Sequence, residues 1–144
     1  TVAKTELPYI LMHGNSEYET MHEKQIETDI ILKLNQFISE KILKLNSLGI
    51  KDLIVDPGFG FGKTIPQQYQ MMEEMQHIGF QKYPLLVGIS RKSFIYKSAG
   101  KSPLEIDEET QILHLKALQK GAKVLRVHDV KSTKKVIQEF LKFH

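Results

Sequence analysis

Side chains that can bind a ligand stand at the ends of four short apolar segments of this 144-residue chain. In chain order they are His13, Asp56, Ser90, Arg91, Lys92, Arg126, His128 and Asp129. In barrels and in open α/β sheets, ligands bind at the carboxyl-terminal ends of the parallel strands. One such residue would mean little, but their recurrence at all four segment ends indicates a ligand site.

The nonapeptide DPGFGFGKT, residues 56–64, begins with one of these side chains. It is no standard nucleotide-binding loop, because its glycines at 58, 60 and 62 fit neither G-x-x-x-x-G-K-[ST] nor G-x-G-x-x-G. Glycines also allow the backbone to approach a flat ligand closely. The Asp56 carboxylate can accept two hydrogen bonds side by side, which suits a ring with adjacent N–H donors.

Strands and helices alternate in the predicted order of elements. The apolar segments are continuous, which is typical of parallel strands covered on both faces, and they span residues 8–12, 52–56, 84–90 and 123–127. Periodicity predicts helices from Ile26 to Leu48, from Pro66 to Gly79, from about Glu105 to Gly121, and through Val136 and Leu141 to the C-terminus. Four such units fit a doubly wound sheet or half of a (β/α)8 barrel, since a complete barrel has ~250 residues.

Composition is that of an ordinary globular protein. The chain is 41% hydrophobic and 26% charged, and its net charge of +3 suits a small anionic ligand. No basic run with interleaved aromatic residues predicts nucleic-acid binding, and no apolar run reaches the ~20 residues of a membrane helix. The absence of cysteine excludes disulfides and thiolate metal sites, and we expect a cytoplasmic location. We also expect residues 1–144 to form one domain, without a signal peptide, from a longer protein.

Three motifs together resemble the dihydropteroate synthase family. They are DPGFGFGKT at 56–64, GISRKSFI at 88–95 and LRVHDV at 125–130. The resemblance covers nearly the whole chain, but only the second half of the family's barrel. It implies an α/β fold that forms the second half of a TIM (β/α)8 barrel, with four parallel β-α units from the fifth strand to the eighth helix.

The resemblance also implies a transferase of folate biosynthesis. The family condenses 6-hydroxymethyl-7,8-dihydropterin diphosphate with 4-aminobenzoate, and it releases 7,8-dihydropteroate and diphosphate. Its mechanism is dissociative, because diphosphate leaves and the amine then attacks a cationic pterin methylene without any side-chain nucleophile. Members are sulfonamide targets. The expected partners are these small-molecule substrates and, in the complete protein, a second copy in a homodimer, rather than nucleic acid or a membrane.

Binding roles for the pterin and the diphosphate follow from matching positions in the three motifs. By resemblance, Asp56 would bind the 2-amino and N3–H edge of the pterin. Lys92 would hydrogen-bond the ring, and Gly88 would leave room for it. Arg126 would lie against the ring and contact the diphosphate, and His128 would take a diphosphate oxygen.

The aminobenzoate pocket and a metal ion complete the implied site. Phe61 and Ser90 would help to form that pocket. The family holds Mg²⁺ with an asparagine from its first four strands, so the resemblance implies Mg²⁺ as cofactor but no metal ligand in this chain. The first half also carries two substrate loops and a further Asp and Asn on the pterin. We therefore expect this chain alone to be inactive.

One segment departs from the family pattern. After its fifth strand the family usually has Met-His-Met-x-Gly-x-Pro-x-Thr-Met, whereas residues 12–21 are MHGNSEYETM. The first two and last two positions match, but Gly14 replaces a methionine that faces the pterin. Two alternatives stay open. One is a non-catalytic pterin-binding barrel or one like the methyltetrahydrofolate-dependent methyltransferases, although a methyl carrier has no diphosphate for SRKS and RVHDV to bind. The other is a degenerate paralogue that acts as a partner.

Structural roles are the alternative for single residues. Lys63 could equally be a solvated lysine or a ligand-binding one. Arg126 within an apolar strand needs a partner, because an unpaired buried charge is costly. His13 is expected to be a hydrogen-bonded structural residue. Since half a barrel exposes unpaired strand edges and apolar surface, we expect the chain to pair with its missing half, to dimerise or to aggregate.

Overall fold

The computed structural model describes Lys4, residues 7–14 and residues 29–143. Its four strands form one parallel sheet in the order β1-β2-β3-β4. The strands are β1 (Tyr9–Met12), β2 (Leu53–Asp56), β3 (Leu85–Val87) and β4 (Ala122–Leu125). Neighbours in sequence are neighbours in the sheet, as in a (β/α)8 barrel. The predicted parallel α/β fold is therefore confirmed.

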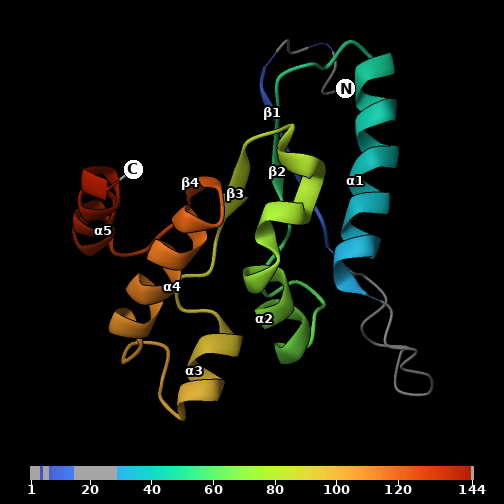
Figure 1. The fold of residues 1–144 in the computed structure, drawn as a ribbon. Helices are drawn as coiled ribbons and strands as arrows, with labels where there is room; N and C mark the ends of the chain where they lie inside the picture. Colours follow the sequence, from blue (N-terminus) through green and yellow to red (C-terminus); the bar gives the residue numbers. More distant parts are fainter. Residues whose placement is uncertain (1–3, 5–6, 15–28, 144) are drawn as a thin grey trace, which may run out of the picture.

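The helices follow the strands along the chain (Figure 1). They are α1 (Ile30–Ser47), α2 (Ile65–Glu73), the 3-10 segment η3 (Met75–Gln81), α3 (Ser93–Ala99), α4 (Asp107–Gln119) and α5 (Val130–Phe143). α1 packs beside α2 and η3, and α4 packs beside α5. The predicted start of the first helix at Ile26 lies outside the described residues. α3 is not among the predicted helices, because a seven-residue helix shows too little periodicity.

The second predicted helix, from Pro66 to Gly79, is wrong beyond Glu73. There the α-helix gives way to η3, and Gly79 has a φ of 64°. The side chain of Asn35 in α1 explains this change, because its Nδ2 donates to the carbonyl of His77 at 2.9 Å and its Oδ1 accepts from the N–H of Gly79 at 2.8 Å. These two bonds to a neighbouring helix replace hydrogen bonds that an α-helix would have made within itself.

The hydrophobic core lies where α1, α2, η3 and α3 cover the sheet. Its fully buried side chains include Leu34, Met71, Met75, Val55 and Phe94. The methionines of α2 and η3 therefore serve packing. Each such side chain contributes roughly 1.5–3 kcal/mol by leaving water. This packing fixes the strands whose ends carry the polar residues.

The carboxyl-terminal ends of the strands meet at one edge of the sheet. Met12 is opposite Asp56, and Val87 is opposite Leu125. β3 and β4 end earlier than predicted, so the residues at positions 88–90 and 126–128 lie in loops just beyond the strands and not within them. Shorter strands leave these side chains freer to turn toward one another.

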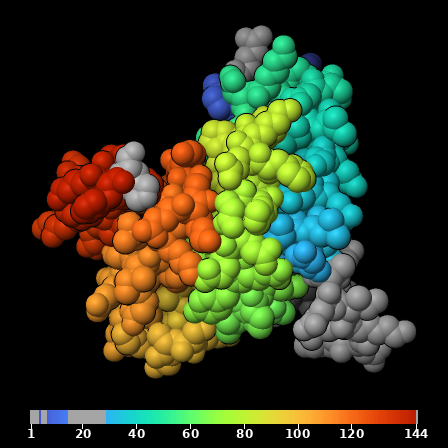
Figure 2. Space-filling model, in the orientation of Figure 1, coloured from blue at the N-terminus to red at the C-terminus, as the bar shows by residue number. Residues whose placement is uncertain are grey.

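α5 lies at one side of the molecule, where Figure 2 shows it as a projecting lobe. Among its described residues only Thr133 is buried, and Leu141 and Phe143 are exposed.

The described helices include none with the length and the apolar character that a membrane span requires.

Candidate functional site

Asp56 is the buried centre of the polar cluster at the strand ends. It is the last residue of β2, and it is only 3% exposed. Oδ1 accepts a hydrogen bond from the backbone N–H of Gly58 at 2.8 Å, and Oδ2 lies 3.9 Å from Nη2 of Arg126. A carboxylate has about four lone-pair sites. Asp56 therefore retains acceptor capacity for N–H donors of a ligand.

Arg126 reaches Asp56 across the loop that follows β3. β4 ends at Leu125, and the Arg126 side chain is 56% exposed. The expectation of a buried charge inside a strand is therefore wrong, because the strand stops one residue earlier. The guanidinium lies over Gly88, where an added Cβ would stand 2.9 Å from both Nε and Nη2. Gly88 thus leaves room for the Arg126 guanidinium.

Lys92 brings a second cation to the cluster. It is the N-cap residue of α3, and its Nζ lies 4.3 Å from the centroid of the Phe61 ring. Burial lowers the pKa of Lys92 and the charge of Arg126 lowers it further, while Asp56 raises it. The Phe61 side chain is 38% exposed, so part of this ring is open to solvent beside the ammonium group.

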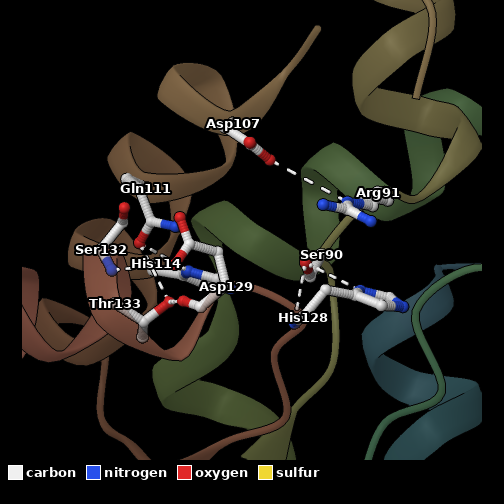
Figure 3. Close-up of polar contacts among 9 residues, drawn as sticks. All are labelled: Ser90, Arg91, Asp107, Gln111, His114, His128, Asp129, Ser132 and Thr133. Atoms are coloured by element: carbon white, nitrogen blue, oxygen red, sulfur yellow. Dashed lines mark hydrogen bonds and ion pairs between the residues drawn. The ribbon is translucent and has the colours of Figure 1, made fainter. Parts of the chain in front are cut away.

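Ser90 and His128 form a direct pair (Figure 3). Ser90 Oγ lies 3.0 Å from Nδ1 of His128 and accepts the backbone N–H of the same residue at 3.3 Å. Ser90 is buried whereas His128 is exposed. Because Nδ1 is engaged, Nε2 is the ring atom left for a ligand. The two residues predicted for the aminobenzoate pocket thus have different neighbours, with Ser90 beside His128 and Phe61 over Lys92.

Two further polar residues of these loops have structural contacts (Figure 3). Arg91 has a left-handed φ of 59°, and its Nε lies 4.0 Å from Oδ1 of Asp107. Asp129 accepts a hydrogen bond from the backbone N–H of Ser132 at 3.0 Å in the first turn of α5. That bond favours a capping role for Asp129 over a role in holding His128.

Lys63 is buried at 6% exposure, so the alternative of a solvated lysine is wrong. Its Nζ donates to the backbone carbonyls of Gly58 at 2.9 Å, Phe61 at 3.1 Å and His13 at 3.3 Å. Burial lowers its pKa to about 8, against the opposing effect of Asp56. The sequence around Lys63 does not predict this role, because one of the three carbonyls belongs to His13, which is fifty positions away in the chain.

The charges of the cluster favour an anionic ligand. Asp56 is one carboxylate within electrostatic reach of Lys63, Lys92 and Arg126. These four described residues carry one negative and three positive charges, so their net charge is positive. Such an excess attracts anionic oxygens, while Asp56 remains a local acceptor for N–H groups.

His13 and Gly14 occupy the end of β1. The His13 backbone N–H donates to the Asp56 carbonyl at 3.0 Å, and its ring packs edge-on against Phe37 with the centroids 4.8 Å apart. Burial, with a smaller effect of Lys63, lowers the pKa of His13 to about 4. Around Gly14, an added Cβ would meet no atom of the described residues within 4 Å. The remainder of the altered segment, from Asn15 to Met21, lies outside the described residues.

A magnesium site is not formed by the described residues alone. Among residues 7–14 and 29–143, no three His, Cys, Asp or Glu side chains lie together in a way that could hold a metal ion. Asp56 is a single carboxylate that already faces Arg126. Mg²⁺ prefers several oxygen ligands, so further ligands would have to come from outside this set.

Comparison with known sequences identifies relatives along most of the chain. A family model described as pterin binding enzyme matches residues 1–128. The dihydropteroate synthase of Escherichia coli strain K12 is 36% identical over 133 residues, which cover 91% of this chain and 47% of that protein. The chain therefore spans about half the length of the curated relatives it matches.

Solved structures give the same correspondence. The Yersinia pestis dihydropteroate synthase, in a sulfonamide drug complex, aligns with a TM-score of 0.89 at 31% identity over 97% of this chain and 52% of its own. The Xanthomonas albilineans dihydropteroate synthase in complex with 7,8-dihydropteroate aligns with a TM-score of 0.86 at 30% identity, over 98% of this chain and 53% of its own. The chain has the fold of about half of each barrel.

Proposed function

This chain belongs to the pterin-binding enzyme family, and on that premise we propose that it forms the second half of a dihydropteroate synthase. The proposed reaction joins 6-hydroxymethyl-7,8-dihydropterin diphosphate to 4-aminobenzoate and releases diphosphate. The observation that carries the proposal is the buried carboxylate of Asp56 at the end of β2, with Arg126 and Lys92 beside it. A pterin diphosphate has N–H donors at one end and anionic oxygens at the other, and so matches both parts of this cluster.

The pterin is bound first in our proposal. Asp56 accepts two N–H groups from the 2-amino and N3 edge of the ring, since its oxygens have free lone pairs beside the Gly58 contact. Lys92 donates to the ring from the start of α3. The guanidinium of Arg126, which is largely exposed over Gly88, lies against the ring and turns toward the diphosphate.

Diphosphate departure is the step that the cations assist. The bond between the pterin methylene carbon and the diphosphate oxygen breaks, and its electron pair leaves with the oxygen. Arg126 donates to the departing anion, and so does His128 through Nε2, because Ser90 occupies its Nδ1. Donors aimed at developing negative charge stabilise such a transition state. The amine nitrogen of aminobenzoate then bonds to the methylene carbon and loses one proton to solvent.

The aromatic amine is received by Phe61 and Ser90 in this proposal. The ring of Phe61 is partly open and lies over the ammonium group of Lys92. Mg²⁺ would supply further charge neutralisation at the diphosphate, with its ligand from the first four strands. We also propose that the complete protein is a homodimer and that this chain alone lacks activity, because it provides one side of the site.

The proposal is tested with Asp56→Asn in the protein that contains this chain together with the first four strands, here called the complete barrel. Asparagine keeps an oxygen for the Gly58 N–H but loses the charge that holds two N–H donors. Hydrogen bonds to charged groups contribute about 1.5–3 kcal/mol, so pterin affinity should fall roughly 10- to 100-fold. Fluorescence titration with 6-hydroxymethylpterin diphosphate measures this change.

Asp52→Asn is the matched control, because Asp52 is an exposed carboxylate just before the same strand. Its pterin affinity should equal that of the unmodified protein. Equal affinities for Asp56→Asn and Asp52→Asn would overturn the role of Asp56. Pterin binding without any dihydropteroate formation would instead indicate a non-catalytic pterin-binding barrel. Association with a synthase without turnover would indicate a degenerate partner.

A further inference from the structure

The loop after β2 is built around the side chain of Lys63. Residues 57–64 connect β2 to α2. Lys63 belongs to this loop and is buried at 6% exposure. Its three hydrogen bonds end on the carbonyls of Gly58, Phe61 and His13. An ammonium group has three N–H donors, so these contacts use its full capacity.

The loop needs such a partner because it makes few backbone bonds of its own. Within its turn, the Phe61 N–H donates to the Gly58 carbonyl at 3.1 Å. Gly58 has a φ of 73°, and an added Cβ would stand 1.8 Å from the carbonyl oxygen of His13. The loop therefore touches the end of β1 directly. The Lys63 ammonium group supplies donors to the carbonyls that are buried in this contact.

A second buried side chain supports the same loop from α2. Gln68, at 2% exposure, accepts the N–H of Gly60 at 2.8 Å and donates to the carbonyl of Lys63 at 3.2 Å. Lys63 and Gln68 therefore both hold the segment that carries Phe61. The backbone of Asp56 also has a support that involves neither residue, because its carbonyl accepts the N–H of His13, directly after β1.

We propose that Lys63 is a positioning residue that fixes Phe61 for the second substrate, the aromatic amine. By holding the Phe61 carbonyl, Lys63 sets the place of that ring over Lys92. This inference rests on the proposed function for the identity of the amine, but the ordering of the loop is a property of the chain itself. Loss of Lys63 is expected to weaken aminobenzoate use more than pterin use, since Asp56 stays in the sheet.

The test uses Lys63→Met in the complete barrel, with Lys97→Met as matched control because Lys97 is exposed in α3. Methionine keeps an unbranched side chain but removes all three donors. Lys63→Met should raise the KM for 4-aminobenzoate at least about 10-fold and the KM for pterin diphosphate less than about threefold. The amides of Gly60 and Phe61 should exchange with deuterium faster than in the Lys97→Met protein.

Unchanged exchange at these amides together with an unchanged KM for aminobenzoate would overturn the inference. Equal increases in both KM values would also overturn it, because they indicate general damage to the site. If Lys63→Met does not fold, Lys63→Arg takes its place, because arginine retains the charge and N–H donors but changes their geometry. Lys63→Arg must then raise the KM for 4-aminobenzoate more than the KM for pterin diphosphate. If the unmodified protein forms no dihydropteroate, the proposed function fails, and the exchange experiment alone still decides whether Lys63 orders the loop.

Discussion

The contact between Gly88 and Arg126 gives a prediction in which ligand binding and stability separate. Gly88→Ala would place a Cβ 2.9 Å from Nε and Nη2 of Arg126, where ordinary contacts lie at 3.4 Å or more. The guanidinium is the free end of a long side chain that is 56% exposed. We therefore expect it to swing away from Asp56 and from the diphosphate position while the sheet stays intact.

The structure sets the size of both effects. The φ of Gly88 lies outside the left-handed region, so alanine is not strained there. The Arg126–Asp56 pair is long at 3.9 Å and solvated on one side, so its loss costs about 0–1 kcal/mol. A glycine-to-alanine change stabilises the folded protein by about 0.4–1 kcal/mol, because it lowers the conformational entropy of the unfolded chain. The free energy of unfolding should therefore change by less than about 1 kcal/mol.

Affinity for the pterin diphosphate should fall much more. A displaced Arg126 loses a charge-assisted hydrogen bond to the ligand, worth about 1.5–3 kcal/mol, or roughly 10- to 100-fold in the dissociation constant. The assay is fluorescence titration of the complete barrel with 6-hydroxymethylpterin diphosphate. A double-mutant cycle with Arg126→Ala is the control, because the two changes should not add if both act through the guanidinium.

Two results would refute this reasoning. Additive losses in the cycle would mean that Gly88→Ala acts on the ligand directly and not through Arg126. A large loss of stability with a proportionate loss of binding would mean that the sheet, and not the guanidinium, yields to the added methyl group.

Three further predictions follow from other parts of the structure. Gly14→Met should tighten pterin binding, because an added Cβ there meets no atom of residues 7–14 and 29–143 within 4 Å and methionine restores the side chain that usually faces the pterin in the family. An unchanged dissociation constant for the pterin diphosphate would count against this prediction. The free energy of unfolding of the unmodified protein, minus that of the Lys63→Met variant, should rise between about pH 8 and pH 10 by at most about 3 kcal/mol. Burial lowers the pKa of Lys63 from 10.5 to about 8 although Asp56 opposes it, so in this window the unfolded chain binds a proton that the folded chain does not. Urea unfolding at several pH values measures the difference, and a flat profile would exclude it. The 144-residue chain on its own should associate at micromolar concentration, because Ile10 and Met12 on the edge strand β1 and Phe143 in α5 are exposed. Sedimentation velocity would contradict this if it found only monomer.

The sequence was sufficient to predict the parallel α/β fold and the four strands that present the site, but not α3, whose N-cap residue is Lys92. Continuous apolar segments identified all four strands, as expected for parallel strands, although β1 leaves Ile10 and Met12 exposed. Their polar end residues then had to meet, because parallel strands in one sheet end at the same edge. Asp56, Lys92 and Arg126 are indeed close enough for their charges to interact. Their roles toward a ligand remain predictions.

Contacts between distant segments were beyond prediction. Lys63 is buried, and one of its three carbonyl partners is that of His13, fifty positions away. η3 departs from an α-helix because Asn35, from α1, bonds to its backbone. Arg126 was expected inside a strand, and the early end of β4 instead leaves it exposed over Gly88. Each difference depends on a partner that is remote in sequence.

The most direct test of the central claim is product formation by the complete barrel. The protein is mixed with 6-hydroxymethyl-7,8-dihydropterin diphosphate, 4-aminobenzoate and Mg²⁺, and both dihydropteroate and diphosphate are measured. We expect the two products in equal amounts and their loss in Asp56→Asn, with Asp52→Asn unaffected. No dihydropteroate from a folded, pterin-binding protein, or undiminished turnover by Asp56→Asn, would contradict it.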